Sequence, residues 1–349
     1  MQRFSHPLAV VLTLAAASCS SHMADAGGGI FESIPSPAIL IANGGNSTIS
    51  IIDPATLQVV ESLPVMSDMN PHHVGVSPDK SRVLITALSG DLSGGHGGTG
   101  GHGGGAESTI VYQLSLDSRE ITDVISIDAT AHNAAFSSDG NTIVLGMMEH
   151  GMIVGFDATT FSQVFEAMGF EMPLEVTPTS TGTVLVAESG AGRIALFDLA
   201  SKATTATFDV GTTPVAAWAS GGGNYYVSVE GGKQVKHLVE DASVTLDSHT
   251  VDPEGVPGQA VLTPNAQELW VAVEDRNVVA YFHPDTHAKL GEFSAGIKPH
   301  GIVFEPSGER AFVTDEEGGN VLVVDVATHT VSSEIALGGK PNGIAWLTR

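Results

Sequence analysis

Basic residues are scarce in this chain. Only 14 Lys and Arg stand against 39 Asp and Glu, which gives a formal net charge of −25. Binding to nucleic-acid phosphates needs clusters of Lys and Arg, and the sequence contains none. An anionic membrane surface would also repel such a chain. We therefore expect no nucleic-acid partner, and contact with a membrane only through an attached lipid.

Cysteines, long hydrophobic runs and common catalytic motifs are also lacking. Cys19 is the sole cysteine of 349 residues, which excludes an internal disulfide. The apolar run at residues 8–17 is too short to span a bilayer. No Gly-x-Ser-x-Gly elbow, phosphate loop or His-Glu-x-x-His motif occurs. The fold must therefore rest on its own core, and we expect no nucleotide or organic cofactor.

The N-terminal segment has the features of an export signal. Its apolar run leads into Ala16-Ala17-Ser18-Cys19, which resembles the lipobox of bacterial lipoproteins. We expect residues 1–18 to be a signal peptide, Cys19 to carry a lipid, and residues 19–37 to form a flexible tether. The alternative is ordinary signal-peptide cleavage and release. Either way, the expected location is the periplasm or the outer cell surface.

A short landmark built on Pro with His or Asn recurs along the chain, and in one copy Ala131 stands in the place of Pro. Seven copies follow one another at an interval of about 42 residues, the clearest being PHHVGVSPD from Pro71, PHGIVFEPSG from Pro299 and PNGIAWL from Pro341. Between landmarks lie short β-branched segments separated by turns rich in Gly, Asn and Asp. This period, with four strands in each unit, is typical of a β-propeller. The sequence therefore predicts an all-β, seven-bladed β-propeller over residues 38–349.

The two ends of the repeat array complement each other. The chain closes with a first strand from Pro341 and opens with second, third and fourth strands from Ala38. We expect the last blade to be closed by N-terminal and C-terminal strands, which leaves no free sheet edge in the ring. The first interval is 18 residues too long. A Gly/His-rich loop insertion at residues 88–106, between two strands of the first blade, accounts for this excess.

The repeat units resemble a known family. Units such as AFVTDEEGGNVLVVDVATHTVSSEIALGGKPNGIAW are similar to the YVTN β-propeller repeat of exported bacterial surface and periplasmic proteins. Related seven-bladed proteins include lactonases, streptogramin lyase-like proteins, protein-binding scaffolds and periplasmic zinc metallochaperones. The resemblance implies an exported propeller, but the fold does not choose among these functions.

Imidazoles gather where the repeat predicts the mouth of the central channel. The innermost strand of each blade lines that channel, so the positions after the landmarks converge there. We place these positions at His72, His132, Met172, Val215, Gly258, His300 and Asn342. Neutral imidazole is a common ligand of zinc and other transition metals. The sequence therefore predicts a zinc-like site built from His72, His73, His132 and His300, whereas Met172 is expected to serve in packing.

Further histidines are expected on the same face. His96 and His102 lie in the Gly-rich insertion, and His150 lies in the matching loop of the second blade. Short His-rich tracts in Gly often bind metal, so these residues are predicted to capture or transfer the ion. The zinc metallochaperone propellers, which pair a propeller site with a His-rich loop, are similar. We therefore predict a non-enzymatic, monomeric binding protein whose partner is a metal ion or an envelope protein.

Two other functions stay open. One is a scaffold that binds proteins or surface polymers without a metal. The other is a lactonase-like or lyase-like enzyme, in which a histidine at the mouth works with a carboxylate as acid and base. His132 or His300 with Glu149 or Glu175 could form such a pair. Glu175 is the carboxylate that we expect deepest in the channel.

Overall fold

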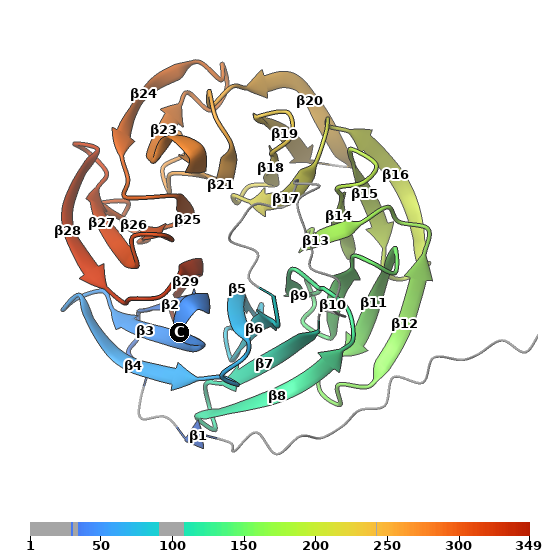
Figure 1. Ribbon diagram of the computed structural model, residues 1–349. Coiled ribbons are helices and arrows are strands. Elements are labelled where there is room, and N and C mark those ends of the chain that lie inside the picture. The colour runs from blue at the N-terminus through green and yellow to red at the C-terminus, as the bar shows by residue number, and fades with distance from the viewer. Residues whose placement is uncertain (1–28, 31–33, 91–107, 242) are drawn as a thin grey trace, which may run out of the picture.

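The computed structural model describes residues 29–30, 34–90, 108–241 and 243–349. Their strands form seven antiparallel sheets arranged in a ring around a central opening (Figure 1). The prediction of an all-β, seven-bladed propeller is confirmed. Within these ranges the helical turns are two short 3-10 segments, η1 (Gly44–Asn46) and η2 (Glu274–Arg276). No helix in the described part of the chain is long and apolar enough to cross a membrane.

Blades 1 to 6 each contain four consecutive strands, of which the first is innermost. Blade 1 comprises β5 (Asn70–Val76), β6 (Arg82–Leu88), β7 (Thr109–Ser115) and β8 (Glu120–Ile127). Blade 2 comprises β9 (Ala134–Phe136), β10 (Thr142–Met147), β11 (Met152–Asp157) and β12 (Gln163–Met168). Blade 3 comprises β13 (Pro173–Pro178), β14 (Thr183–Glu188), β15 (Arg193–Asp198) and β16 (Ala203–Asp209). Blade 4 comprises β17 (Pro214–Ala219), β18 (Asn224–Val229), β19 (Gln234–Glu240) and β20 (Val244–Val251). Blade 5 comprises β21 (Pro257–Leu262), β22 (Leu269–Val273), β23 (Val278–Phe282) and β24 (Lys289–Ser294). Blade 6 comprises β25 (Pro299–Phe304), β26 (Arg310–Asp315), β27 (Asn320–Asp325) and β28 (Thr330–Ala336).

Blade 7 closes the ring as the sequence predicts. Its innermost strand is β29 (Pro341–Leu347), which pairs with β2 (Ala38–Asn43), followed by β3 (Thr48–Asp53) and β4 (Gln58–Pro64). The two ends of the propeller are thus joined by backbone hydrogen bonds. One strand was not expected: β1 (Gly29–Ile30), inside the predicted tether, pairs with the outer edge of β8 in blade 1.

The innermost strands are irregular at the landmark itself. In blade 6, Pro299 of β25 lies opposite Asp315 of β26, and the next paired residues are Ile302 and Val313. Two residues, His300 and Gly301, are therefore opposite the single residue Thr314. The strands of several other blades show a similar shift directly after Pro. Such bulges bend a strand and redirect its side chains. This backbone feature places the side chain after each landmark at the end of the channel where the inner strands begin.

Apolar side chains fill the interfaces between neighbouring blades. Leu40 and Ile49 of blade 7 pack with Val83 and Ile85 of blade 1 in one cluster of fully buried residues. A similar cluster centred on Trp270, which is 0% exposed, joins blades 5 and 6. Each fully buried aliphatic side chain contributes roughly 1.5–3 kcal/mol. The blades therefore stabilise one another as a closed ring.

Acid should weaken the turns that connect the strands, and Asp79 in the β5–β6 turn is the clearest case. Its carboxylate accepts bonds from the hydroxyl of Ser77 at 2.6 Å and from the hydroxyl and N–H of Ser81 at 2.8 and 3.0 Å. The Ser77 bond, followed by those from Ser81, lowers the pKa of Asp79 from 3.8 to about 2. A group with a lowered folded-state pKa stabilises the fold above its unfolded-state pKa and loses this effect as the pH falls through the folded-state value.

The free energy of unfolding should fall as the pH is lowered from about 4 to about 2, and we expect it to fall less steeply in Asp79→Asn than in the wild type. Urea titrations at several pH values measure this slope for the wild type and the variant. An identical slope in both proteins would show that Asp79 does not contribute.

Candidate functional site

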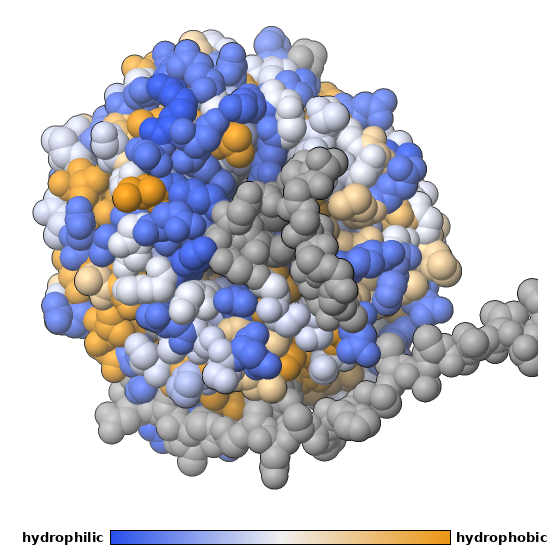
Figure 2. Space-filling model, in the orientation of Figure 1, coloured by the Kyte–Doolittle hydropathy of each residue, from blue (hydrophilic) through white to orange (hydrophobic). Residues whose placement is uncertain are grey.

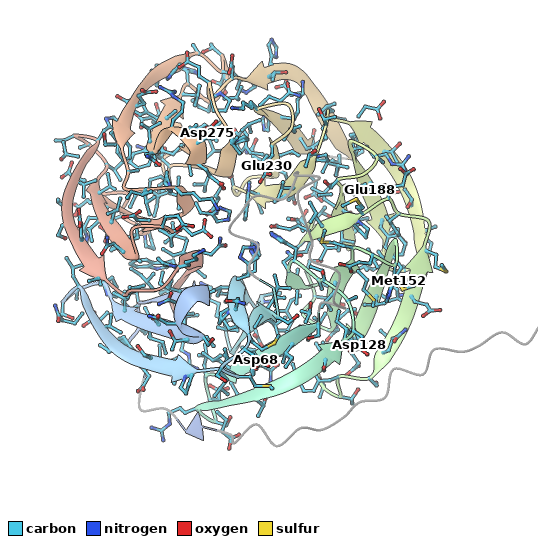
Figure 3. The ribbon with its side chains drawn as sticks, in the orientation of Figure 1. Asp68, Asp128, Met152, Glu188, Glu230 and Asp275 are labelled. Carbon is cyan, nitrogen blue, oxygen red and sulfur yellow. The ribbon has the colours of Figure 1, made fainter. Side chains whose placement is uncertain are left out.

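Four histidines meet at the channel mouth. His72 and His73 are the third and fourth residues of β5, His300 is the second residue of β25, and His132 lies in the bend before β9. All four are buried, with exposures of 6%, 9%, 4% and 0% respectively. The rings of His72 and His132 are 4.4 Å apart between centroids, and those of His72 and His300 are 6.3 Å apart. The ring closure thus brings together imidazoles from blades 1, 2 and 6. Figure 3 shows side chains of several blades reaching the central opening.

A continuous chain of contacts runs through the first half of the site. Nε2 of His72 lies 2.9 Å from Nε2 of His132, and Nδ1 of His132 lies 2.9 Å from Oε1 of Glu175. The same carboxylate oxygen lies 2.9 Å from Nε2 of His73. Glu175 is 3% exposed in β13 of blade 3. Because a buried carboxylate needs a donor or a positive charge, Glu175 fixes a proton on Nδ1 of His132.

One arrangement of protons satisfies both hydrogen bonds of His132. With Nδ1–H donated to Glu175, Nε2 of His132 accepts, and His72 must therefore donate its own Nε2–H. The remaining basic nitrogen of His72 is then Nδ1. A positive charge formed on His72 would be stabilised through His132 by the Glu175 carboxylate. This is the arrangement of a relay that supports a general base.

A second network surrounds His300 on the other side of the mouth. Its Nδ1 donates to Oε1 of Glu274 at 2.8 Å, whereas its buried Nε2 has no hydrogen-bond partner among the described residues. Lys298 lies 2.7 Å from Oε2 of Glu316, and Glu316 also accepts from the amide of Asn342 at 3.0 Å. Glu274 and Glu316 come from the loops that follow the second strands of blades 5 and 6.

The charges of this second network favour a cationic His300. Burial opposes a charge on His300, but the hydrogen bond and the negative charge of Glu274 outweigh it and raise the pKa above its usual value of 6.5. Burial likewise opposes a charge on Lys298, and Glu316 and Glu274 still raise its pKa. Two buried carboxylates are balanced by two cations only when His300 is protonated. His300 is therefore suited to donate a hydrogen bond or a proton from Nε2.

An aromatic residue that the sequence analysis did not single out lies beside both networks. Trp218 of β17 has its ring centroid 6.0 Å from that of His73 and 6.5 Å from that of His300. Its indole N–H donates to the hydroxyl of Ser228 at 2.9 Å, which fixes the ring. Trp218 thus offers an apolar surface next to the imidazoles. Trp218 is the fifth residue of β17, a position that ordinary packing residues occupy in other blades, so nothing in the repeat pattern marks it as functional.

Other carboxylates at this end of the propeller have a structural role. Each lies at or just after the end of a second strand and accepts a backbone N–H from the segment that leads into the first strand. These pairs are Glu149 with Thr130, Glu188 with Glu171, Asp275 with Val256 and Asp315 with Ile297, at 2.6–2.9 Å. Glu149, predicted at the channel mouth, also binds the Thr130 hydroxyl at 2.5 Å and is exposed. It therefore secures a loop instead of holding an imidazole.

The remaining predicted residues are distributed as follows. Asn342 is buried in the His300 network, whereas His150 is exposed in the β10–β11 turn. Met172 precedes β13 and is 43% exposed, and the residue after Pro173 is the buried Leu174. Leu174, and not Met172, therefore occupies the position after the third landmark Pro and packs in the interior. The two predictions made for Met172 are wrong. Cys19, His96 and His102 lie outside the described residues.

The mouth could also hold a metal ion. His72, His73 and His132 each offer a ligand atom within 4.8 Å of the other two. Three imidazoles suit zinc, and Glu175 behind His132 is the kind of partner that orients a ligating histidine. A metal bound here would replace the hydrogen bond between His72 and His132. Zinc binding by this cluster stays a prediction.

Comparison with known proteins supports the fold. No protein-family model matches the chain, and no curated protein sequence matches it. The periplasmic gluconolactonase of Pseudomonas aeruginosa is 16% identical, with a TM-score of 0.69 over 90% of this chain and 99% of that one. A proposed 6-phosphogluconolactonase of Bacteroides fragilis is 18% identical, with a TM-score of 0.67 and the same coverage. Hydrazine synthase of Kuenenia stuttgartiensis is 14% identical, with a TM-score of 0.66 over 86% of this chain and 99% of that one.

These similarities correct the functional prediction. Identities of this size establish a shared fold, and the seven-bladed architecture is shown, whereas the finer resemblance to the YVTN repeat stays a prediction. The prediction of a non-enzymatic binding protein is contradicted by the lactonase names among the similar structures. The lactonase-like alternative agrees with these names better.

Proposed function

We propose that the protein is a lactonase-like hydrolase that opens a cyclic ester at the channel mouth. The observation that carries the proposal is the pair of opposed networks: His72–His132–Glu175 on one side and His300–Glu274 on the other. Ester hydrolysis needs a base for the attacking water and an acid for the leaving oxygen. The lactonase names of similar folds support the same reaction class.

In this proposal His72 acts as the general base. It is 6% exposed, whereas His132 behind it is 0% exposed. His72 accepts a proton from water as the water oxygen attacks the lactone carbonyl carbon. The resulting imidazolium is stabilised through the hydrogen bond to His132 and by the charge of Glu175. His132 and Glu175 are thus positioning residues.

His300 supplies the acid. Its unpartnered Nε2 and its raised pKa make it a donor toward an oxygen that gains negative charge. As the ring C–O bond breaks, the alkoxide takes this proton and the product is released as a hydroxy acid. Solvent then restores both histidines to their starting protonation states. The step requires no cofactor for its balance.

The charge of the mouth favours an uncharged substrate. Glu175, Glu274 and Glu316 are all buried here, and Lys298, which contacts Glu274 and Glu316, is already paired with Glu316. A phosphorylated lactone would bring negative charge toward these three carboxylates, and the cationic His300 that faces the mouth is already assigned to the leaving oxygen as the acid. In Figure 2 polar residues predominate over blade 5, which suits a hydroxylated ring. We therefore propose a neutral sugar lactone, and the acidic product would be repelled by the net charge of −25.

Removal of the acid should slow turnover strongly. We expect His300→Gln to lower kcat for glucono-lactone hydrolysis by roughly 10²-fold or more, the usual range for a general acid or base. Because the raised pKa of His300 keeps it protonated, the wild-type rate should fall as the pH rises through that pKa, and the variant should lack this alkaline decline. His150→Gln, the same change at an exposed histidine, is the control. A rate in His300→Gln that equals the control would contradict the assignment.

Chelation separates acid–base chemistry from metal chemistry at the same histidines. We expect dialysis against a strong chelator to leave the rate of lactone hydrolysis unchanged, because the proposed proton transfers use only side chains. The measurement is kcat before and after dialysis, with elemental analysis of both samples. Loss of activity that added Zn²⁺ restores, while circular dichroism shows that the protein stays folded throughout, would overturn the acid–base assignment and would favour His72, His73 and His132 as metal ligands.

A further inference from the structure

A second cluster of metal-binding side chains lies between blades 4 and 5. His237 comes from β19, Asp247 from β20, and His287 from the turn between β23 and β24. One ligand atom of each lies within 4.8 Å of the other two. Because strand direction alternates within a blade, the β23–β24 turn is at the end of the propeller opposite the channel mouth. The cluster is therefore separate from the site proposed for lactone hydrolysis.

A bulge in blade 4 brings the ligands of this cluster together. In the pairing of β19 with β20, Lys236 lies opposite Thr250 and Leu238 lies opposite Leu246. The three residues 247–249 of β20 are therefore opposite the single residue His237 in the backbone register. Bulges often redirect side chains at functional sites. Here one redirects Asp247 and His249 toward the neighbouring blade. Their own contact, from Nδ1 of His249 to Oδ1 of Asp247 at 2.8 Å, leaves Oδ2 of Asp247 facing His237.

The ring of His237 is held as metal-binding histidines usually are. Its Nε2 lies 2.9 Å from Oδ1 of Asn224 and donates to it, and its ring stacks on Tyr226 with centroids 4.6 Å apart. This hydrogen bond assigns the ring proton to Nε2 and leaves Nδ1 with its lone pair. Nδ1 lies 3.5 Å from Oδ2 of Asp247, too far for a strong hydrogen bond, and has no other partner in the part of the chain that the structure describes. An outer hydrogen bond that fixes the tautomer is typical of metal sites.

His287 is the strongest indication of a ligand. It is 8% exposed, and neither of its ring nitrogens makes a hydrogen bond of good geometry with the described residues, although the backbone of Pro284 and the charge of Asp247 favour its protonated form. Its ring centroid lies 5.8 Å from those of both His237 and His249. A buried imidazole without a good hydrogen bond does not recover the free energy that it loses when it leaves water. A bound ion would compensate for this loss.

We propose that His237, Asp247 and His287 form a binding site for zinc or a similar transition metal. Two imidazole nitrogens and one carboxylate oxygen are a donor set that zinc accepts, and calcium or magnesium would require oxygen donors instead. The fourth ligand is water or His249, whose side chain is 67% exposed. Ligand atoms around tetrahedral zinc are roughly 3.3 Å apart, a spacing within reach of small side-chain rotations.

The position of this site gives it a structural role. The ion would join two strands of blade 4 to a turn of blade 5, and would add to the apolar packing, the Lys233–Asp275 ion pair and the Ser228–Gly258 hydrogen bond that already connect these blades. A metal that binds only the folded protein stabilises it by an amount that grows with the logarithm of the metal concentration above its Kd. We therefore expect Zn²⁺ to raise the thermal midpoint of the untagged protein.

The test compares His287→Asn with His329→Asn. Both residues have a positive φ, of +57° and +53°, in equivalent turns of adjacent blades, and asparagine tolerates this conformation. His329 stacks on Tyr281 and bonds Glu268, outside the cluster. We expect His287→Asn to bind one equivalent of Zn²⁺ fewer than the wild type and than His329→Asn, by elemental analysis and competition with a coloured chelator. The thermal shift caused by Zn²⁺ should be lost in His287→Asn alone.

A second variant covers the case in which His287→Asn folds poorly. Asp247→Asn keeps the side-chain shape and should also lose the Zn²⁺ equivalent and the thermal shift. Equal Zn²⁺ content and equal thermal shifts in the wild type and in both cluster variants would overturn the proposal. Lactone hydrolysis should persist in both variants, so failure here and failure of the proposed reaction can be told apart.

Discussion

Replacing Glu175 by glutamine is expected to lower kcat for lactone hydrolysis by roughly 10²–10⁴-fold, with little change in KM. The carboxylate holds the proton on Nδ1 of His132, and an amide can donate there and force the opposite tautomer. In serine proteases the corresponding change of a buried acid costs about 10⁴ in kcat through the same loss of tautomer control. Because Glu175 is 3% exposed and acts behind two histidines, it should affect the rate more than substrate binding.

Two measurements make this expectation specific to Glu175. The variant should shift the acidic limb of the pH–rate profile, which reports the base, toward lower pH, because the imidazolium of His72 loses a stabilising charge; a merely structural role would leave the limb in place. Glu149→Gln is the matched control, because Glu149 secures the backbone of Thr130 and contacts no mouth histidine. It should lose some thermal stability and keep the rate. Full activity in Glu175→Gln would remove the proposed base relay.

The largest effect on stability is expected from removal of the last nine residues, 341–349. These include β29, which pairs with β2 and closes the ring. Ile344 and Trp346 pack into the interface between blades 6 and 7, and Leu347 is 2% exposed in the interface with blade 1. The combined loss should exceed about 5 kcal/mol, which is comparable to the whole stability of an ordinary domain.

The truncated chain should therefore show no cooperative thermal transition by circular dichroism. Deletion of only Thr348 and Arg349 is the control, since these residues follow the last strand. That shorter deletion should lower the thermal midpoint by only a few degrees. A truncated chain without β29 that melts cooperatively near the wild-type temperature would show that ring closure does not determine stability.

The repeat predicts the fold and the convergence of the mouth histidines, because equivalent positions of each repeat occupy equivalent places in each blade. His72, His132 and His300 lie next to one another once the ring closes. The repeat places the third landmark position at Met172, whereas strand β13 begins at Pro173 and gives this position to Leu174. A period locates strands to within a residue or two, and a shift of that size changes which side chain faces the channel.

The contacts of the site could not be derived from the repeat. Glu274 and Asp275 are adjacent, yet Glu274 binds His300 whereas Asp275 secures Val256. The η2 turn sets this difference, and the sequence pattern gave no sign of it. The cluster of His237, Asp247 and His287 depends on a bulge in a single blade. Features that interrupt a repeat are not predicted by its period, and both proposed sites depend on such features.

Hydrolysis of neutral glucono-lactone by the untagged wild-type protein, followed as acid release at constant pH, tests the central claim most directly. We predict turnover well above the spontaneous rate, reduced by roughly 10²-fold or more in both His72→Gln and His300→Gln and unchanged in His150→Gln. Turnover no faster than the spontaneous reaction, or equal rates in all four proteins, would contradict an acid–base site at the mouth of this propeller.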